Sequence, residues 1–274
     1  MSASTRDVLT LDKSSISQIS PYIPQPGVHH PDSPDDRPHV TLTFATSLDS
    51  NLSLAPGVQT ALSGPQSKAM THYLRSKHSA ILIGVGTAIA DDPSLNCRFE
   101  GVGGYGGKGV EGQPRPIVID PQARWQWSAE SKVIKLAREG KGRAPWVFTL
   151  VEVDGERRKT LESVGGEVII AGAQPSSRMS WDYILYELKR RDTESVMIEG
   201  GGAVINDLLT PSNIRFVDTV VVTIAPVWLG KGGVQVCPDE REVGGNKVPI
   251  ARLKDVKWVP LGDDVVLCGV APRH

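Results

Sequence analysis

Two glycine-rich segments, each directly after an apolar run of strand length, contain residue types suited to binding a phosphate or a nucleotide. The first follows residues 80–83 and contains Gly84, Gly86 and Thr87, and the second is the Gly-Gly-Gly of residues 200–202. Glycine has no Cβ, so a phosphate can approach the backbone closely, and the first turn of a following helix offers unpaired N–H groups. For the second segment the alternative is a strand-to-helix turn that needs glycine only for its geometry.

The first segment continues into a pair of carboxylates and an arginine. Asp91 and Asp92 precede Pro93, and Arg98 follows five residues after the proline. Thr87 can donate a hydrogen bond to a phosphate or an amide, and Arg98 can hold a phosphate through two parallel hydrogen bonds. Because the residue before a proline is pushed out of the helical region, a turn is the alternative for the two aspartates. Paired carboxylates also occur in metal sites and glycosidases, but the sequence has no third ligand at suitable spacing, so we predict no metal.

Isolated polar residues elsewhere have weaker interpretations. Asp49 lies just beyond the carboxyl end of a strand predicted for residues 39–46, and ligands in open α/β sheets bind at that end. Asp49 could therefore orient or protonate a substrate, whereas an aspartate after a strand also commonly caps a turn. His72 and His78, at the helix predicted for residues 65–77, are expected at its surface rather than as ligands.

An alternating series of strands and helices is needed to position these residues. Apolar and β-branched runs predict strands at residues 39–46, 80–84, 116–120, 146–150, 168–171, 196–198, 217–224, 252–260 and 265–270. Helical spacing predicts helices at residues 65–77, 131–139, 157–164 and 181–190 and after residue 202. Strands that alternate with helices need crossover connections, which predicts a mostly parallel sheet covered on both faces. The predicted fold class is α/β, with a mixed sheet whose C-terminal strands are antiparallel.

Composition excludes several classes of partner. The chain has 274 residues, a formal net charge of −1 and three cysteines without a Cys-x-x-Cys pair. A nearly neutral chain offers no bulk attraction to nucleic acid, and three isolated cysteines fit a reducing compartment. No apolar run is long enough to span a membrane, and the N-terminus lacks the apolar core of a signal peptide. We therefore expect a cytoplasmic protein with no nucleic-acid or membrane partner.

Two regions differ from the alternating pattern. Residues 1–38 are rich in proline, which excludes a continuous helix or a central strand, so they are predicted to form an N-terminal arm, with residues 39–274 as the one folded domain. Residues 101–113 are rich in glycine but have no strand before them and no helix after them. This context predicts a flexible surface loop rather than a phosphate site.

Several segments occur together in an order that is found in one family. They are Ser47-Leu48-Asp49, Met70-Thr71-His72-Tyr73-Leu74-Arg75, Ile83-Gly84-Val85-Gly86-Thr87, Asp91-Asp92-Pro93-Ser94-Leu95-Asn96-Cys97, Ile198-Glu199-Gly200-Gly201 and Ala225-Pro226-Val227-Trp228-Leu229-Gly230. Over roughly residues 39–270 the chain resembles the riboflavin-pathway reductases, and within them the fungal stand-alone type. The resemblance implies a dihydrofolate-reductase-like fold, NADPH as hydride donor and a homodimer. It also implies reduction of the ribosyl group of a ribosylaminopyrimidinone 5′-phosphate to the ribityl form.

The resemblance also implies roles for individual residues. Cofactor contacts fall on Gly86, Thr87, Asp91, Ile170, Glu199, Gly200, Gly201, Gly202 and Ala203. The substrate side falls on Asp49, Ser63, Asn96 and Arg98, with Asp49 as the candidate catalytic residue that aids ring opening or holds the ribose hydroxyls. The chain departs from many bacterial relatives in two ways. Ser50-Asn51 replaces a Gly-Lys pair, and the zinc deaminase motif of the fused bacterial proteins is absent.

Other functions remain open at this point. One is a reductase of the same fold that acts on a pterin or a folate, and another is a non-catalytic nucleotide-binding module. The intact set of cofactor candidates argues against the second. The choice of NADPH over NADH comes from the resemblance, and the sequence does not choose among Arg157, Arg158 and Arg178 as partners of a 2′-phosphate.

Overall fold

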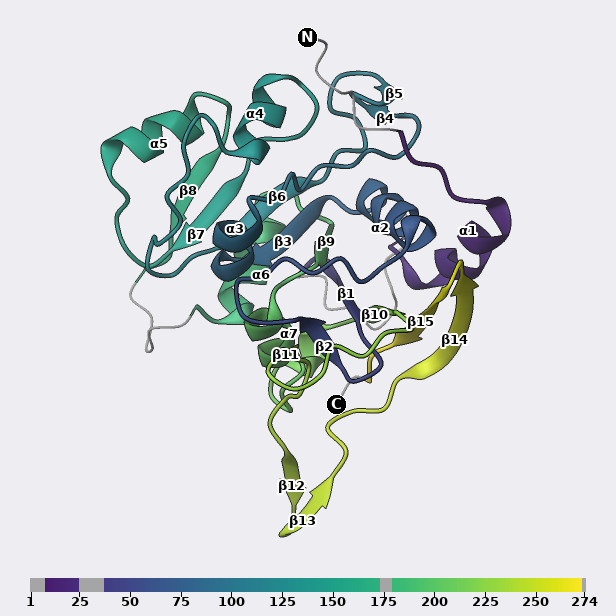
Figure 1. Ribbon diagram of the computed structural model, residues 1–274. Coiled ribbons are helices and arrows are strands. Elements are labelled where there is room, and N and C mark those ends of the chain that lie inside the picture. The colour runs from purple at the N-terminus through teal and green to yellow at the C-terminus, as the bar shows by residue number, and fades with distance from the viewer. Residues whose placement is uncertain (1–7, 25–36, 173–178, 273–274) are drawn as a thin grey trace.

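The computed structural model describes residues 8–24, 37–172 and 179–272, with a nine-stranded sheet at the centre (Figure 1). In spatial order the strands are β14 (Lys254–Leu261), β15 (Asp264–Val270), β10 (Thr219–Ile224), β1 (His39–Thr46), β9 (Ser195–Ile198), β3 (Ala80–Gly84), β6 (Arg115–Ile119), β7 (Trp146–Thr149) and β8 (Glu167–Ile170). The strands from β10 to β8 are parallel, whereas β15 is antiparallel to both β10 and β14. The predicted α/β class, the mixed sheet and its antiparallel C-terminal hairpin are therefore confirmed.

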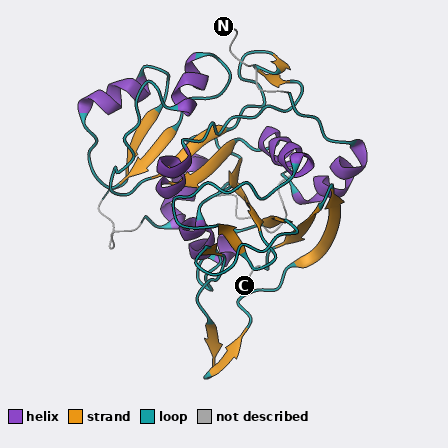
Figure 2. Ribbon diagram, viewed as in Figure 1, coloured by secondary structure: helices purple, strands orange, loops and turns teal. Residues whose placement is uncertain are grey.

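Helices cover both faces of the sheet (Figure 2). One face carries α6 (Trp181–Arg190) and α7 (Gly202–Leu208), and the other carries α1 (Lys13–Ile19), α2 (Pro65–Ser76), α3 (Val85–Asp91), α4 (Lys132–Arg138) and α5 (Gly155–Glu162). In β9, Val196 and Ile198 pack in the core formed with α6 and α7, whereas Met197 packs in the core that includes Met70 of α2. This split follows from the strand geometry, because successive side chains of a strand point to opposite faces. Each of these fully buried side chains contributes about 1.5–3 kcal/mol to folding.

Short elements complete the chain. They are the 3-10 helices η1 (Ser20–Tyr22) and η2 (Ile214–Phe216) and the strands β2 (Asn51–Ser53), β4 (Val102–Gly103), β5 (Gly106–Gly107), β11 (Val234–Gln235), β12 (Arg241–Val243) and β13 (Asn246–Val248). Strand β2 pairs with β11, and β12 pairs with β13 in a hairpin that projects from the body (Figure 1).

Some helix N-termini are capped by a side chain, and others are not. Asp12, Asp154 and Ser180 each accept a hydrogen bond from the backbone N–H three residues later, at the starts of α1, α5 and α6. Such caps satisfy one of the N–H groups that a helix leaves unpaired. Helices α3 and α7 instead begin after Gly84 and Gly201, which supply no side-chain cap. The first turns of these two helices therefore have donors left for another partner.

Helix α3 is one element that the sequence did not predict. A turn was the alternative interpretation of Asp91 and Asp92, and the chain does turn there, because Asp92 adopts a left-handed conformation with φ of 39°. The preceding seven residues, however, form a helix that ends at Asp91. A helix this short with a glycine inside it has little apolar periodicity, so the pattern could not reveal it.

The described part of the predicted N-terminal arm packs on the body. Ile19 is completely buried in a core that contains Leu74 of α2. Leu9 forms a parallel bridge with Phe99, in which its N–H donates to the carbonyl of Arg98 at 2.9 Å. Residues 8–24 thus support both α2 and the segment that carries Arg98.

The expected exposure of His72 and His78 is wrong, whereas the surface loop predicted for residues 101–113 is confirmed. His72 and His78 are only 6% and 4% exposed, because other chain segments cover α2 on their side. In the loop at residues 101–113, Gln113 is 2% exposed and donates hydrogen bonds to the carbonyls of Cys97 and Gly103. Most residues of this loop are exposed, as predicted for a surface loop, and only Val102, Gly103 and Gln113 at its base are buried.

Candidate functional site

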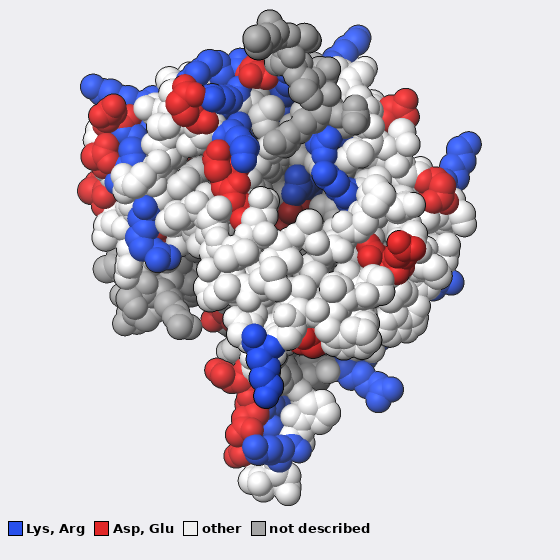
Figure 3. Space-filling model, viewed as in Figure 1, with Lys and Arg blue, Asp and Glu red and all other residues white. Residues whose placement is uncertain are grey.

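A large cavity opens at the carboxyl ends of the four central strands β10, β1, β9 and β3. Its volume is about 1160 Å³, and it is lined at these ends by Thr223, Phe44, Glu199 and Gly84. A hollow with acidic and basic side chains in and around it is visible on this face of the molecule (Figure 3). After β1 the chain forms β3, β6, β7, β8 and β9 on one side of β1, and it then forms β10 on the other side. Crevices at such a reversal of strand order are where open α/β sheets bind ligands.

The two glycine-rich segments meet in this cavity. A Cβ placed on Gly201 would lie 2.8 Å from the hydroxyl oxygen of Thr87, and one on Gly200 would lie 2.6 Å from Val204. By contrast, a Cβ on Gly86 would meet nothing within 4 Å. The glycines at 200 and 201 are therefore required for close packing, and Gly86 leaves open space beside the backbone. This arrangement fits a cradle for an extended ligand, because the uncapped first turns of α3 and α7 both line the cavity.

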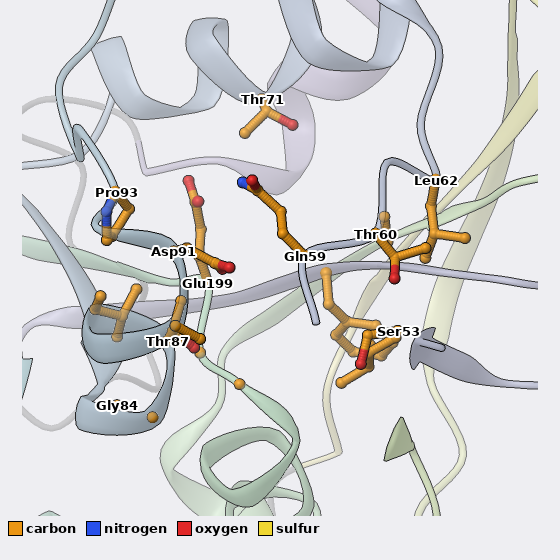
Figure 4. Close-up of a pocket in the computed structure, with 18 of the residues that line it drawn as sticks. Ser53, Gln59, Thr60, Leu62, Thr71, Gly84, Thr87, Asp91, Pro93 and Glu199 are labelled. Atoms are coloured by element: carbon orange, nitrogen blue, oxygen red, sulfur yellow. The ribbon is translucent and has the colours of Figure 1, made fainter. Parts of the chain in front are cut away.

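Asp91 and Asp92 have different environments. The Asp91 side chain faces the cavity near Glu199 (Figure 4), and within the described parts of the chain no hydrogen bond to its carboxylate is found. Burial raises the pKa of Asp91, and the nearby Lys132 partly opposes this. Asp92 accepts a hydrogen bond from the backbone N–H of Lys132 at 3.2 Å, so it caps helix α4. The turn interpretation thus describes Asp92, and Asp91 remains available to a ligand.

Arg75 of α2 is a cavity residue for which the sequence indicated no role. Its guanidinium holds Glu199 through two hydrogen bonds of 2.7 and 2.6 Å and donates a third, of 2.9 Å, to the carbonyl of Asn96. The side chains of Arg75 and Glu199 are 14% and 18% exposed. Burial lowers the pKa of Arg75, but the adjacent Glu199 carboxylate outweighs burial and the net pKa is raised. The pair joins α2, the end of β9 and the segment after Pro93.

Other positively charged side chains line the cavity on the side of α2. Lys68 and Arg98 both belong to the lining, and Arg98 is 7% exposed. The backbone N–H of Arg98 donates to Nδ1 of His72 at 3.0 Å, which fixes the position of this residue against α2. Ser63, at the loop before α2, also lines the cavity. The cavity therefore combines a glycine cradle at one wall with cations and hydroxyls at another.

The structure brings together most, but not all, of the residues selected from the sequence. Gly86, Thr87, Asp91, Glu199, Gly200, Gly201, Gly202, Ala203, Ser63, Asn96 and Arg98 line the cavity. Asp49 and Ile170 do not. Ile170 ends β8, the strand at the far edge of the sheet.

Two substrate-side candidates are engaged by the protein itself. The Asp49 carboxylate accepts hydrogen bonds from the backbone N–H groups of Leu229 and Gly230 at 3.1 and 2.7 Å. The hydroxyl of Ser47 and these N–H groups hold the pKa of Asp49 well below its usual range. The side-chain nitrogen of Asn96 donates to the hydroxyl of Tyr105 and to the carbonyl of Lys141. Both side chains therefore support loops around the cavity.

The candidate partners of a 2′-phosphate lie elsewhere. Arg157 donates to the carbonyls of Ala123 and Trp125, and Arg158 pairs with Glu152. Neither arginine lines the cavity, and Arg178 lies outside the described residues. Across the described ranges, no group of three His, Cys, Asp or Glu residues is arranged to hold a metal ion. Within the same ranges, every helix is too short or too polar to cross a bilayer.

The fold and the cavity define the class as an open α/β protein with a large cavity at the carboxyl ends of its central parallel strands. The sequence model described as the RibD C-terminal domain matches residues 38–267, and the chain belongs to that family.

Similar proteins support this assignment. The chain is 38% identical over 255 residues to the 2,5-diamino-6-ribosylamino-4(3H)-pyrimidinone 5′-phosphate reductase of Debaryomyces hansenii, covering 91% of this chain and 93% of the relative. It is 40% identical to the reductase of the same name from Candida glabrata, covering 85% and 88%. The solved structure of the riboflavin biosynthesis reductase of Saccharomyces cerevisiae superposes with a TM-score of 0.72 at 30% identity, covering 95% of this chain and 100% of that one. RibD of Acinetobacter baumannii shares the fold, with a TM-score of 0.66 at 22% identity, covering 87% and 59%.

Proposed function

We propose that the protein reduces the ribosyl group of 2,5-diamino-6-ribosylamino-4(3H)-pyrimidinone 5′-phosphate to the ribityl form, with NADPH as the reductant. The relatives that match most of the chain are named as reductases of this compound. The observation that carries the proposal is that both glycine segments and the cation-bearing wall of α2 face one cavity of about 1160 Å³. Pockets for one drug-sized ligand are about 300–1000 Å³, so this volume suits a cofactor and a substrate together.

The cofactor side of the cavity is assigned to the glycine cradle. Gly86 and Thr87 from the first segment and residues 200–203 from the second would hold the dinucleotide, whose reduced nicotinamide supplies a hydride when bound. The open space beside Gly86 and the uncapped start of α7 fit the diphosphate of such a molecule. Asp91 has no hydrogen bond to its carboxylate from the described residues, so it is available to accept one from a ribose or an amide.

The substrate side is assigned to the wall formed by α2 and the segment around Arg98. Ser63, Lys68 and Arg98 offer a hydroxyl and two cations to the 5′-phosphate. Opening of the ribosylamine gives an imine at C1′, which is reduced at carbon while a proton is added at nitrogen. Because the cofactor supplies the hydride, the remaining task of the protein is to align the two ligands and to exclude water.

An oxidation assay tests the proposal. Purified protein mixed with NADPH and the pyrimidinone phosphate is expected to lose the absorbance of NADPH and to yield the ribityl product by mass spectrometry. Dihydrofolate and a pterin serve as alternative substrates, and NADH serves as the alternative reductant. Turnover with dihydrofolate but not with the pyrimidinone would favour the folate alternative, and absence of turnover with each would favour a binding module.

We also infer that the protein acts as a cytoplasmic homodimer. Trp228, Val243 and Trp258 are 73%, 56% and 53% exposed, and large exposed apolar side chains are candidates for a contact with a second copy of the chain. The three cysteines are all free, which fits a reducing compartment. Light scattering after size-exclusion chromatography measures the assembly mass, and a monomer at micromolar concentration would contradict the dimer.

A further inference from the structure

Gln59 is carried by the loop that forms the cavity wall opposite the glycine cradle. This loop, residues 54–63, connects β2 to α2 and contributes several lining residues. In the close-up, the Gln59 side chain reaches into the cavity toward the side on which Asp91 and Glu199 lie (Figure 4). A polar side chain of this length therefore lies where a substrate beside the cradle would be in reach.

The loop that carries Gln59 is held by its own hydrogen bonds. The backbone N–H of Leu54 donates to the hydroxyl of Thr60 at 3.1 Å, and the N–H of Val58 donates to the carbonyl of Ala55 at 3.2 Å. The first bond joins the two ends of the segment 54–60, and the second closes the turn at residues 55–58. The position of the Gln59 backbone is thus defined without any contribution from its own side chain.

The cavity offers few groups that can both donate and accept in one plane. Carboxylates such as Asp91 only accept, lysine and arginine only donate, and a hydroxyl has a single hydrogen. A carboxamide presents a donor and an acceptor side by side. Among the described residues, two carboxamides line the cavity, those of Asn96 and Gln59. The side-chain nitrogen of Asn96 is committed to Tyr105 and Lys141, whereas in the described ranges the Gln59 amide has no hydrogen-bond partner.

The heterocycle of the proposed substrate has a matching edge. A 4(3H)-pyrimidinone carries N3–H as a donor directly beside the C4 carbonyl as an acceptor. A carboxamide pairs with such an edge through two parallel hydrogen bonds, in the way that glutamine pairs with the edge of a base. We propose that Gln59 recognises the N3–H and C4 carbonyl of the pyrimidinone and is a specificity-determining residue of this site, an inference that rests on the proposed function.

The pairing also defines what Gln59 does not recognise. The ribose and the 5′-phosphate lie on the other side of the heterocycle and are assigned to the wall with Lys68 and Arg98. The hydride donor is assigned to the cradle around Gly86 and Gly201. Loss of the Gln59 amide should therefore weaken ligands that contain the heterocycle and leave NADPH and a bare sugar phosphate unaffected.

Steady-state kinetics of Gln59→Met tests this assignment, because methionine keeps the length of the side chain and removes both hydrogen-bonding groups. We expect the KM for the pyrimidinone phosphate to rise roughly tenfold to a hundredfold, since two buried substrate groups lose their partners. Gln59→Leu, which also removes both hydrogen-bonding groups, should raise KM by a similar factor. The dissociation constant of NADPH and the inhibition constant of ribose 5-phosphate should equal those of the wild type in both variants.

A matched control is Gln126→Met. Gln126 is an exposed glutamine whose amide donates only to the carbonyl of Arg124, at 3.4 Å, and it does not line the cavity. This variant should keep the wild-type KM for the pyrimidinone phosphate. It controls for the general effect of replacing a surface glutamine by methionine.

Each outcome has a distinct meaning. A wild-type KM in Gln59→Met, with an active wild-type enzyme, would overturn the assignment and leave the proposed function standing. An equal loss of affinity for ribose 5-phosphate would also overturn it, because Gln59 would then contact the sugar phosphate. If the wild-type protein does not oxidise NADPH with the pyrimidinone, the proposed function is wrong and the assignment of Gln59 falls with it.

Discussion

The hydroxyl oxygen of Thr87 lies 2.8 Å from the point that a Cβ on Gly201 would occupy. The turn at Gly201 and the start of the helix at Thr87 are therefore in close contact, although they are far apart in the sequence. A larger residue at position 201 would clash with Thr87. The contact defines the corner of the cavity to which we assign the nicotinamide cofactor, so its integrity can be tested directly by substitution.

Gly201→Ala should weaken NADPH binding by about 1–3 kcal/mol, because the added methyl group forces Thr87 or the turn itself to move. NADPH fluorescence titration measures the dissociation constant. Gly155→Ala is a matched control, since a Cβ at Gly155 would meet nothing within 4 Å. The same substitution made in a Thr87→Ala background should cost less than it does alone, and an equal cost in both backgrounds would contradict the contact.

Arg75→Lys should lower both stability and turnover. A lysine cannot form the two hydrogen bonds to the Glu199 carboxylate and, at the same time, the hydrogen bond to the carbonyl of Asn96. Breaking a mostly buried ion pair costs about 3–5 kcal/mol when one charge is left unpaired, and lysine should recover part of this. Urea unfolding gives the free energy of unfolding.

Arg215→Lys is the control for Arg75→Lys. Arg215 forms an ion pair with Asp182, and the side chains of the two residues are 57% and 70% exposed. Exposed pairs contribute about 0–1 kcal/mol, so this variant should be nearly as stable as the wild type. Equal effects of the two substitutions would mean that the pair at Glu199 has no special structural role.

His78 should make the protein less stable as the pH falls from about 6.5 to about 4. Burial lowers the pKa of His78 from 6.5 to about 4, and its two ring nitrogens contact the carbonyl of Leu74 and the hydroxyl of Thr41 at 2.7 and 2.8 Å. Over this range the unfolded chain binds a proton at His78 and the folded protein does not, so acid favours unfolding. The full effect is about 2–4 kcal/mol.

Urea unfolding at pH 7 and at pH 4.5 measures this contribution when wild type is compared with His78→Gln. Other groups also titrate in this range, so the readout is the difference between the two proteins in the stability lost on acidification. The variant should lose less than the wild type. Equal losses would show that His78 does not supply this part of the pH dependence.

Asp49→Asn should destabilise the segment around residues 229–230 and have little effect on turnover. The carboxylate holds the N–H groups of Leu229 and Gly230 and does not line the cavity. We therefore expect a lower melting temperature, faster proteolysis near this segment and retained turnover. Loss of turnover with unchanged stability would restore Asp49 as a residue that acts on the substrate.

Much of the fold and part of the site could be predicted from local patterns. The strand at residues 80–84 and the helix at residues 181–190 have the predicted bounds, because apolar alternation and helical spacing are properties of short stretches of chain. The two glycine segments could also be recognised from the sequence as tight turns, because a turn that leaves no room for a side chain requires glycine. Helix α3 was missed because seven residues with an internal glycine have too little pattern to detect.

The sequence by itself determined which segments become strands, helices and glycine turns, because these depend on neighbours along the chain. Only the tertiary structure decided which side chains meet. Arg75 and Glu199 are 124 residues apart and join only because α2 packs beside the end of β9. Asp49 lies at the correct end of its strand but turns toward Gly230, whereas Gln59, in an unremarkable loop, reaches into the cavity. Such contacts depend on the packing of distant elements, and no local pattern contains that information.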